Sequence, residues 1–228
     1  DNMVVRIYNS VQMIQLEKVE QELISVKDYF NLEERERSFL YFGRPARNKG
    51  VFILEAAVAK LYREGKVPEN VRFCWLLAEE PCGQRQMLLD SMERHGIMDK
   101  VSVRESVNRK KLMKIISGVD YVIIPSITEG FGFCAVEACT LGKNVIYSSG
   151  GSLPEVVFGK CLMFHNMDVD DLAEKLQMVI ERGDKVFKHI PEKYFEKDRM
   201  VAEMLCLYKR VLLESMKNGT PDKGKNQR

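Results

Sequence analysis

From about residue 38 onward, short runs of apolar residues alternate with longer stretches in which apolar positions recur every three or four residues. The apolar runs predict strands at residues 39–43, 71–77, 101–103, 120–126 and 144–149. The longer stretches predict helices at residues 50–63, 84–95, 109–117, 133–141, 153–157, 169–181 and 198–214. Strands that are apolar throughout and alternate with helices are typical of a parallel sheet covered on both faces. The pattern therefore predicts an α/β fold.

The two ends of the chain depart from this pattern. Residues 1–30 contain an isolated strand-like run, VVRIY (4–8), and a charged stretch. The closing residues, KNGTPDKGKNQR, are polar and lack periodicity, so we expect a disordered tail at residues 216–228. We place one domain at residues 38–215. We interpret residues 1–37 as a strand and linker that connect this domain to a preceding part of the protein.

Composition narrows the class of protein. The chain has 228 residues, 45% of them hydrophobic, and a net charge of +2. These values suit a sizeable core and indicate no nucleic-acid or membrane-surface binding. No apolar run is long enough for a transmembrane segment, and no signal peptide opens the sequence. The six cysteines lack CxxC spacing and the three histidines do not cluster, so we expect reduced thiols, a cytoplasmic location and no metal site.

Three unusual loops follow predicted strands. They are GRPARNKG (43–50), EGFG (129–132) and SSGGS (148–152). In open parallel sheets, ligands bind beyond the carboxyl ends of the strands, where loops lead into helices. We therefore expect one edge of the sheet to bring the three loops together.

The first loop contains Arg44, Arg47 and Lys49. An arginine fork and a lysine ammonium both suit phosphate oxygens. The EGFG turn leads into a helix, whose N-terminal N–H groups and dipole favour an anion. Together they predict a clamp for a diphosphate, although basic loop residues are more often solvated surface.

Two acids bracket the glycine turn. Glu129 precedes it, and Glu137 lies about one turn inside a helix that is otherwise apolar. Side chains on a helix lean toward its N-terminus, so Glu137 could reach the space in front of the helix and accept hydrogen bonds from a pair of sugar hydroxyls. Each acid alone is more often a structural partner, Glu129 as a cap and Glu137 in an ion pair. Their joint placement at a strand end favours a binding site.

At these residues the chain resembles family 4 (group 1) of the retaining glycosyltransferases, which have the two-lobed GT-B architecture. EGFGFCAVE matches the family's E-x7-E signature, GRPARNKG its G-R-x4-K-G loop, and GGSLPEV (150–156) its G-G-x-P-E-V turn. The match extends from about residue 39 to 181, with the motifs in order. The resemblance implies one lobe of a GT-B fold, a Rossmann-like doubly wound parallel sheet that binds the nucleotide-sugar donor.

The resemblance also implies roles for individual residues. Arg44 and Lys49 would hold the diphosphate, Glu129 the hydroxyls of the transferred sugar, and Glu137 the ribose hydroxyls. Catalytic roles are implied for Glu129, Arg44 and Lys49, whereas residues 104–107 lie where the family cradles the base. The implied donor-site residues are Gly43, Arg44, Lys49, Val107, Glu129, Gly130, Phe131, Gly132, Phe133, Cys134 and Glu137.

The implied activity is transfer of a hexose-type sugar, with mannose and glucose as candidates, from a UDP- or GDP-sugar to a hydroxyl acceptor. The donor is a substrate, and neither a cofactor nor a metal is implied because basic side chains would supply the charge. The acceptor, a glycan or lipid, would bind an N-terminal lobe missing from this chain. Peripheral membrane association would act through that lobe, and we expect the isolated chain to be inactive.

The sequence departs from the family pattern in two places. LLAEEPCG (76–83) replaces a glycine turn and brings Glu79 and Glu80 toward an anion site, and RIYNSV (6–11) lacks the Pro, Gly and Asp of the family's corresponding strand. The alternative interpretation is a non-catalytic nucleotide-sugar-binding module. A dehydrogenase fits poorly, because no G-x-G-x-x-G follows the first predicted strand. An epimerase or a phosphorylase with the same two-lobed fold stays open, although a phosphorylase needs a lysine-bound pyridoxal cofactor, for which the sequence has no signal.

Overall fold

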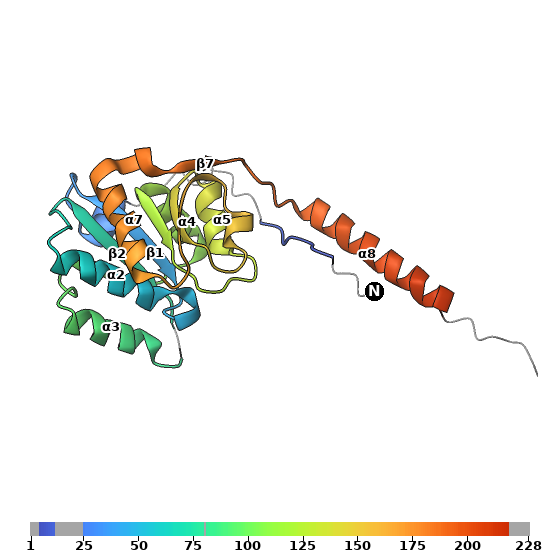
Figure 1. The fold of residues 1–228 in the computed structure, drawn as a ribbon, viewed down its shortest axis with the longest axis horizontal. Coiled ribbons are helices and arrows are strands. Elements are labelled where there is room, and N and C mark those ends of the chain that lie inside the picture. The colour runs from blue at the N-terminus through green and yellow to red at the C-terminus, as the bar shows by residue number, and fades with distance from the viewer. Residues whose placement is uncertain (1–4, 12–24, 80, 219–228) are drawn as a thin grey trace, which may run out of the picture. The chain divides into compact units, whose positions relative to one another are not determined.

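The structure is a computed structural model, and it describes residues 5–11, 25–79 and 81–218 (Figure 1). The chain divides into two compact units. One is Met13–Lys193, and the other combines Asp1–Gln12 with Tyr194–Arg228. The domain limits expected from the sequence, 38–215, stay a prediction.

Within the described part of the larger unit, seven strands form one sheet in the order β3-β2-β1-β4-β5-β6-β7. The strands are β1 (Arg37–Gly43), β2 (Val71–Leu77), β3 (Val101–Glu105), β4 (Tyr121–Ile124), β5 (Asn144–Ser148), β6 (Gly159–Phe164) and β7 (Lys188–Ile190). All neighbours pair in parallel except β7, which runs antiparallel to β6. The prediction of an α/β fold built on a parallel sheet is confirmed.

Helices lie before, between and after the parallel strands. They are α1 (Val26–Phe30), α2 (Val51–Arg63), α3 (Gln84–Arg94), α4 (Arg109–Gly118), α5 (Phe133–Thr140), α6 (Leu153–Val156) and α7 (Val169–Arg182), with short 3-10 turns η2 (Arg47–Lys49) and η3 (Gly183–Val186). Every helix predicted between residues 50 and 181 is present, with limits that differ by at most a residue. Helix α7 illustrates why: the Asp168 side chain accepts from the N–H groups of Asp170 and Asp171, and Gly183 follows its last turn.

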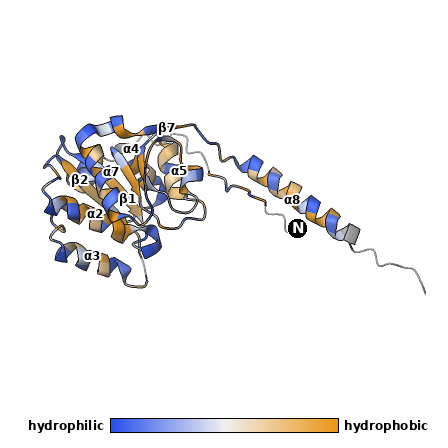
Figure 2. Ribbon diagram, viewed as in Figure 1, coloured by the Kyte–Doolittle hydropathy of each residue, from blue (hydrophilic) through white to orange (hydrophobic). Residues whose placement is uncertain are grey.

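The core lies on both faces of the sheet because successive strand residues point to opposite sides. On one face Phe39, Trp75 and Ile123 pack against α2, α3 and α7. The buried residues of α4 and α5 lie outside that cluster and cover the other face. Figure 2 shows hydrophobic positions gathered in the strands and mixed with hydrophilic ones along the helices. Helices on both faces make this a doubly wound, Rossmann-like sheet.

The sheet reverses its strand order at β1. The chain runs outward from β1 through β2 to β3, then crosses back to β4 on the other side of β1. The loops that leave β1 and β4 therefore diverge toward opposite faces, which opens a crevice at the carboxyl ends of these two strands. This reversal positions the candidate site.

In the described part of the larger unit, the sequence analysis missed one α-helix and two strands, besides the short 3-10 turns. Helix α1 has only five residues, and β7 is a polar strand of three residues at the edge of the sheet. Strand β6 has the sequence GKCLMF, of which only Cys161, Leu162 and Phe164 are buried. These segments are too short or too polar for the periodicity on which the predictions depend.

The smaller unit also differs from expectation. Residues 5–11 form no strand, so the prediction for VVRIY is wrong where the structure describes it; Val11 N donates to Phe195 O at 3.0 Å, and the rings of Tyr8 and Phe195 meet edge to face. Helix α8 (Lys197–Asn218) extends past the predicted end and into the expected tail, of which residues 219–228 lie outside the described residues. Over the described residues, no helix is long and apolar enough to cross a membrane.

Candidate functional site

The loop after β1 is docked directly on the loop after β4. Asn48 O accepts from Ile127 N at 2.9 Å, and Gly50 follows with φ of +67°. A Cβ on Gly50 would lie 1.7 Å from Pro125 O, so only glycine permits this approach. The contact fixes where the side chain of Lys49 leaves the backbone.

Lys49 and Glu129 form an ion pair across the two loops. Lys49 Nζ lies 2.7 Å from Glu129 Oε1, and the two side chains are only 24% and 11% exposed. Ser126 Oγ donates to the same carboxylate oxygen at 2.8 Å. Glu129 is therefore held by a cation and a hydroxyl that come from different loops.

The third loop holds the backbone of Glu129. Glu129 O accepts from both the N–H and the hydroxyl of Ser152, each at 3.2 Å. Gly151 approaches so closely that a Cβ there would lie 2.6 Å from Glu129 N. The three loops that follow β1, β4 and β5 thus meet around one residue, Glu129.

A cavity of about 340 Å³ opens beside this carboxylate. Six of the residues predicted for the site line it: Gly43, Arg44, Lys49, Glu129, Phe133 and Cys134. Its remaining walls come from the ends of β1 and β4 and from the residues that follow β2 and β4. A volume of this size falls at the lower end of the range for small-molecule sites.

Helix α5 points its N-terminus at the cavity, because its first two residues, Phe133 and Cys134, line the cavity wall. The N-cap is Gly132, in the left-handed conformation with φ of +87°, so no side chain caps the first turn. Its N–H groups and dipole favour an anion at this end. The Phe133 ring is 49% exposed and meets the buried ring of Phe131 edge to face at 5.0 Å.

Glu137 has a second cation as its partner. Arg109 Nη2, from the first residue of α4, lies 2.7 Å from Glu137 Oε1. Burial raises the pKa of the Glu137 carboxyl, and the positive charge of Arg109 opposes that rise. The Glu137 side chain is 11% exposed, whereas that of Arg109 is 61% exposed.

Two further groups at the cavity have shifted pKa values. Burial, with a smaller contribution from the charge of Glu137, raises the pKa of the Cys134 thiol to about 11. Burial also raises the pKa of Tyr41, whose hydroxyl donates to Arg44 O at 2.8 Å. Both groups are therefore protonated near neutral pH, and Tyr41 shapes the arginine loop through this hydrogen bond.

The structure does not place every predicted residue in the cavity wall. Gly130, Phe131 and Gly132 form the turn behind it, and Val107 and Glu137 lie outside its lining. Of the two acids that depart from the family pattern, Glu79 is exposed and Ala78 lines the wall in its place, whereas Glu80 lies outside the described residues.

The sequence analysis missed Ser126 and Arg109. Ser126 carried no signal beyond its place at the end of a predicted strand, and the observed strand β4 ends before it, at Ile124. Arg109, with Lys110 and Lys111, opens a helix, where basic residues oppose the helix dipole. That misfit was the available signal that one of these cations has a partner elsewhere.

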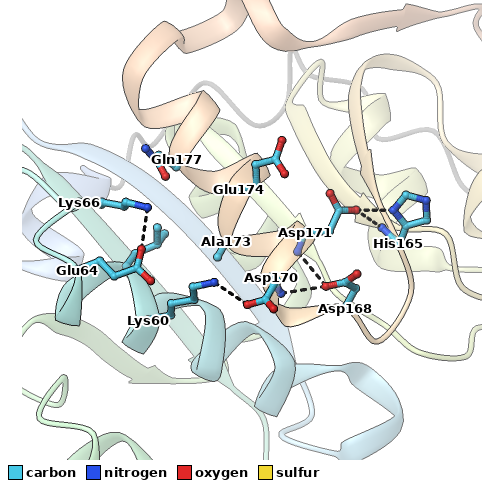
Figure 3. A pocket seen from close by; sticks show the side chains of 11 residues that line it. Lys60, Glu64, Lys66, His165, Asp168, Asp170, Asp171, Ala173, Glu174 and Gln177 are labelled. Carbon is cyan, nitrogen blue, oxygen red and sulfur yellow. Dashed lines mark hydrogen bonds and ion pairs between the residues drawn. The ribbon is translucent and has the colours of Figure 1, made fainter.

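A larger cavity, about 500 Å³, lies between α2 and α7 (Figure 3). Its charged side chains are engaged with one another: Lys60 pairs with Asp170 at 2.6 Å, Lys66 with Glu64, and Asp168 caps α7. None of the residues predicted for the site lines it. Among the described residues, no group of three or more His, Cys, Asp or Glu could hold a metal ion, here or elsewhere. We interpret this cavity as a gap between packed helices whose charged side chains stabilise one another.

The sequence of this chain is similar to a known protein family and to several proteins of named activity. The family model described as "Glycosyl transferases group 1" matches residues 26–193. The MMP alpha-(1->4)-mannosyltransferase of Mycolicibacterium hassiacum is 32% identical over 174 residues, which cover 72% of this chain and 40% of that protein. The chain spans less than half the length of the curated relatives it matches.

Solved structures agree on the fold. Sucrose-phosphate synthase from Thermosynechococcus elongatus superposes with a TM-score of 0.66 at 21% identity, covering 91% of this chain and 52% of that one. Anabaena Alr3699/HepE, solved in complex with UDP-glucose, gives a TM-score of 0.62 at 20% identity, covering 79% of this chain and 48% of that one. At these identities the likeness establishes a shared architecture.

Proposed function

The chain belongs to the group 1 glycosyl transferases, and on that premise we propose that it is the donor-binding lobe of a retaining glycosyltransferase. The lobe binds a UDP- or GDP-sugar, and the enzyme transfers the hexose to a hydroxyl acceptor. The observation that carries the proposal is the meeting of Lys49 and Glu129, 2.7 Å apart, at a cavity that Arg44 also lines. A cation for phosphate and an acid for sugar hydroxyls are both present at one crevice of a doubly wound sheet.

The diphosphate lies between the arginine loop and the start of α5. Arg44 and Lys49 approach it from one side, and the N–H groups of the first turn of α5 face it from the other. When the sugar leaves, negative charge grows on the nucleoside diphosphate. Cations and helix dipoles that are already in place stabilise that charge without having to reorganise, and so lower the barrier.

The two acids hold opposite ends of the donor. Glu129, fixed by Ser126 and by the Ser152 loop, accepts hydrogen bonds from hydroxyls of the transferred sugar. Glu137, one turn inside α5, accepts from the ribose hydroxyls, and the segment around Val107 lies beside the base. Glu129 orients the sugar and is not assigned as a nucleophile. The acceptor attacks on the face from which the phosphate leaves, and the phosphate takes up the acceptor proton.

The acceptor site lies on a second lobe, in the same gene product or on another chain. Closure of that lobe would exclude water and place the acceptor hydroxyl against the sugar. We therefore expect this chain alone to bind the donor and to transfer the sugar poorly. The same division of labour distinguishes the enzyme from a simple binding module, which would need no second lobe.

Two of the similar proteins have names that bear on the donor. The first relative is named as a mannosyltransferase, and the Anabaena neighbour was solved with UDP-glucose. The first name supports a hexose as the transferred sugar, and the second supports a hexose carried on UDP.

The experiment is a thermal-shift panel of UDP-, GDP- and ADP-sugars on this chain and on Lys49→Ala. We expect one nucleotide series to raise the Tm of the wild type in a concentration-dependent way, and a much smaller rise for the variant. Stabilisation by none of the series, or by one series equally in both proteins, would contradict the proposal.

A further inference from the structure

Arg109 and Glu137 come from different crossover helices, yet they form the closest ion pair that either side chain makes in the described structure. Arg109 is the first residue of α4, whose N-cap Asn108 accepts from Lys111 N at 2.9 Å. This cap fixes the start of α4, and with it the point from which the Arg109 side chain extends. The start of α4 therefore determines the position from which Arg109 contacts Glu137 of α5.

Burial does not explain where Arg109 lies. Its side chain is 61% exposed, so it fills little of the core, and a cation at a helix N-terminus is opposed by the helix dipole. Glu137 presents the complementary need: its carboxylate is 11% exposed, and a charge with so little solvent requires a partner. The ion pair therefore neutralises the charge of Glu137, and it places Arg109 where the dipole of α4 disfavours a cation.

We propose that Arg109 is a positioning residue for nucleotide binding, which keeps the Glu137 carboxylate ionised and holds it in place for the ribose hydroxyls. The proposal rests on the function proposed above. Arg109 itself touches neither the sugar nor the diphosphate, so it acts through Glu137 alone.

The geometry of the pair leaves Glu137 able to do this. The contact joins a single guanidinium nitrogen, Nη2, to a single carboxylate oxygen, Oε1. A carboxylate has two oxygens and about four acceptor positions. Arg109 can therefore anchor one oxygen while the other oxygen and the remaining acceptor position of the first stay available to hydroxyls.

Calorimetric titration of this chain tests the proposal, with UDP and GDP as nucleotide probes and inorganic pyrophosphate as a probe that lacks ribose. Arg109→Ala should weaken binding of the preferred nucleotide by about tenfold, as expected for a charge-assisted contact. Pyrophosphate binding should change by less than about twofold. Arg109→Lys should recover most of the nucleotide affinity, because a lysine retains the charge. Lys110→Ala, an exposed neighbour of the same charge, should leave both affinities unchanged.

A double-mutant cycle separates positioning from a direct contact. Glu137→Ala should weaken nucleotide binding, and adding Arg109→Ala to it should produce no further loss. A further loss in that background, an equal loss for pyrophosphate, or unchanged nucleotide binding by Arg109→Ala would overturn the proposal while the proposed function stood. A wild-type chain that binds pyrophosphate but neither nucleotide would overturn both.

Discussion

Lys49 Nζ lies 2.7 Å from Glu129 Oε1, although the two residues are 80 positions apart in the chain. The pair joins the loops that diverge where the strand order of the sheet reverses. If the donor's diphosphate binds Lys49, it must compete with the carboxylate of Glu129 for the same ammonium group. The pair would therefore couple the affinity for phosphate to the group that we propose holds the sugar.

Glu129→Gln tests this competition, because it keeps the shape of the side chain and removes its charge. We expect pyrophosphate to bind about three- to tenfold more tightly, since an opposing ion pair worth about 1 kcal/mol is lost. Sugar transfer by the complete enzyme should fall at the same time. Calorimetry with pyrophosphate measures the first effect, and a transfer assay the second.

Glu79→Gln is the matched control for that substitution. It removes the same charge from an exposed residue next to Ala78 in the cavity wall. If pyrophosphate bound more tightly by the same factor to both variants, the cause would be the lower negative charge of the protein and not the loss of the ion pair. Weaker pyrophosphate binding by Glu129→Gln would contradict the competition.

Lys49→Ala should weaken the binding of pyrophosphate and nucleotide alike, by about 10- to 100-fold, because a charge-assisted contact to phosphate is lost. Lys60→Ala provides the comparison. Lys60 is paired with Asp170 at the larger cavity, so its loss should leave both affinities unchanged. A larger effect from Lys60→Ala would move the phosphate site to that cavity.

Gly50→Ala should destabilise the fold by about 2–5 kcal/mol, because a left-handed backbone costs alanine energy and the new Cβ would press on Pro125 O. Gly65→Ala separates the two effects. Gly65 has nearly the same φ, +65°, but open space around its Cβ position, so only about 1–2 kcal/mol is expected. Urea denaturation measures both, and equal losses would show that the close approach contributes nothing.

Cys134 should react slowly with iodoacetamide at pH 7.5. Burial raises the pKa of its thiol to about 11, so the reactive thiolate is scarce at pH 7.5. Its rate should climb as the pH rises toward 11, provided the fold persists. A bound nucleoside diphosphate should slow the reaction further, since Cys134 lines the cavity. Exposed Cys206, followed in the same mass spectra, should be indifferent to the nucleotide.

Local sequence predicted the sheet well where strands are apolar throughout. Residues 71–77 form a strand with the predicted limits, because Val71, Phe73, Trp75 and their neighbours are buried on both faces. The sequence analysis missed β6, whose apolar run covers only residues 161–164, and β7, whose one apolar residue is Ile190. In both, pairing with neighbouring strands supplies the stabilisation. The sequence analysis also wrongly predicted a strand for the run VVRIY, of which residues 5–8 form no strand in the described structure.

The sequence by itself determined that three loops with basic, acidic and glycine residues follow strands of a parallel sheet, and hence that they would share one edge. Only the tertiary structure decided the partners: Lys49 with Glu129 and Arg109 with Glu137. The physical reason is the sequence distance over which each interaction acts. Periodicity and turn chemistry act over a few residues, whereas these ion pairs depend on the reversal of strand order, which brings together side chains from loops and helices that are distant in the chain.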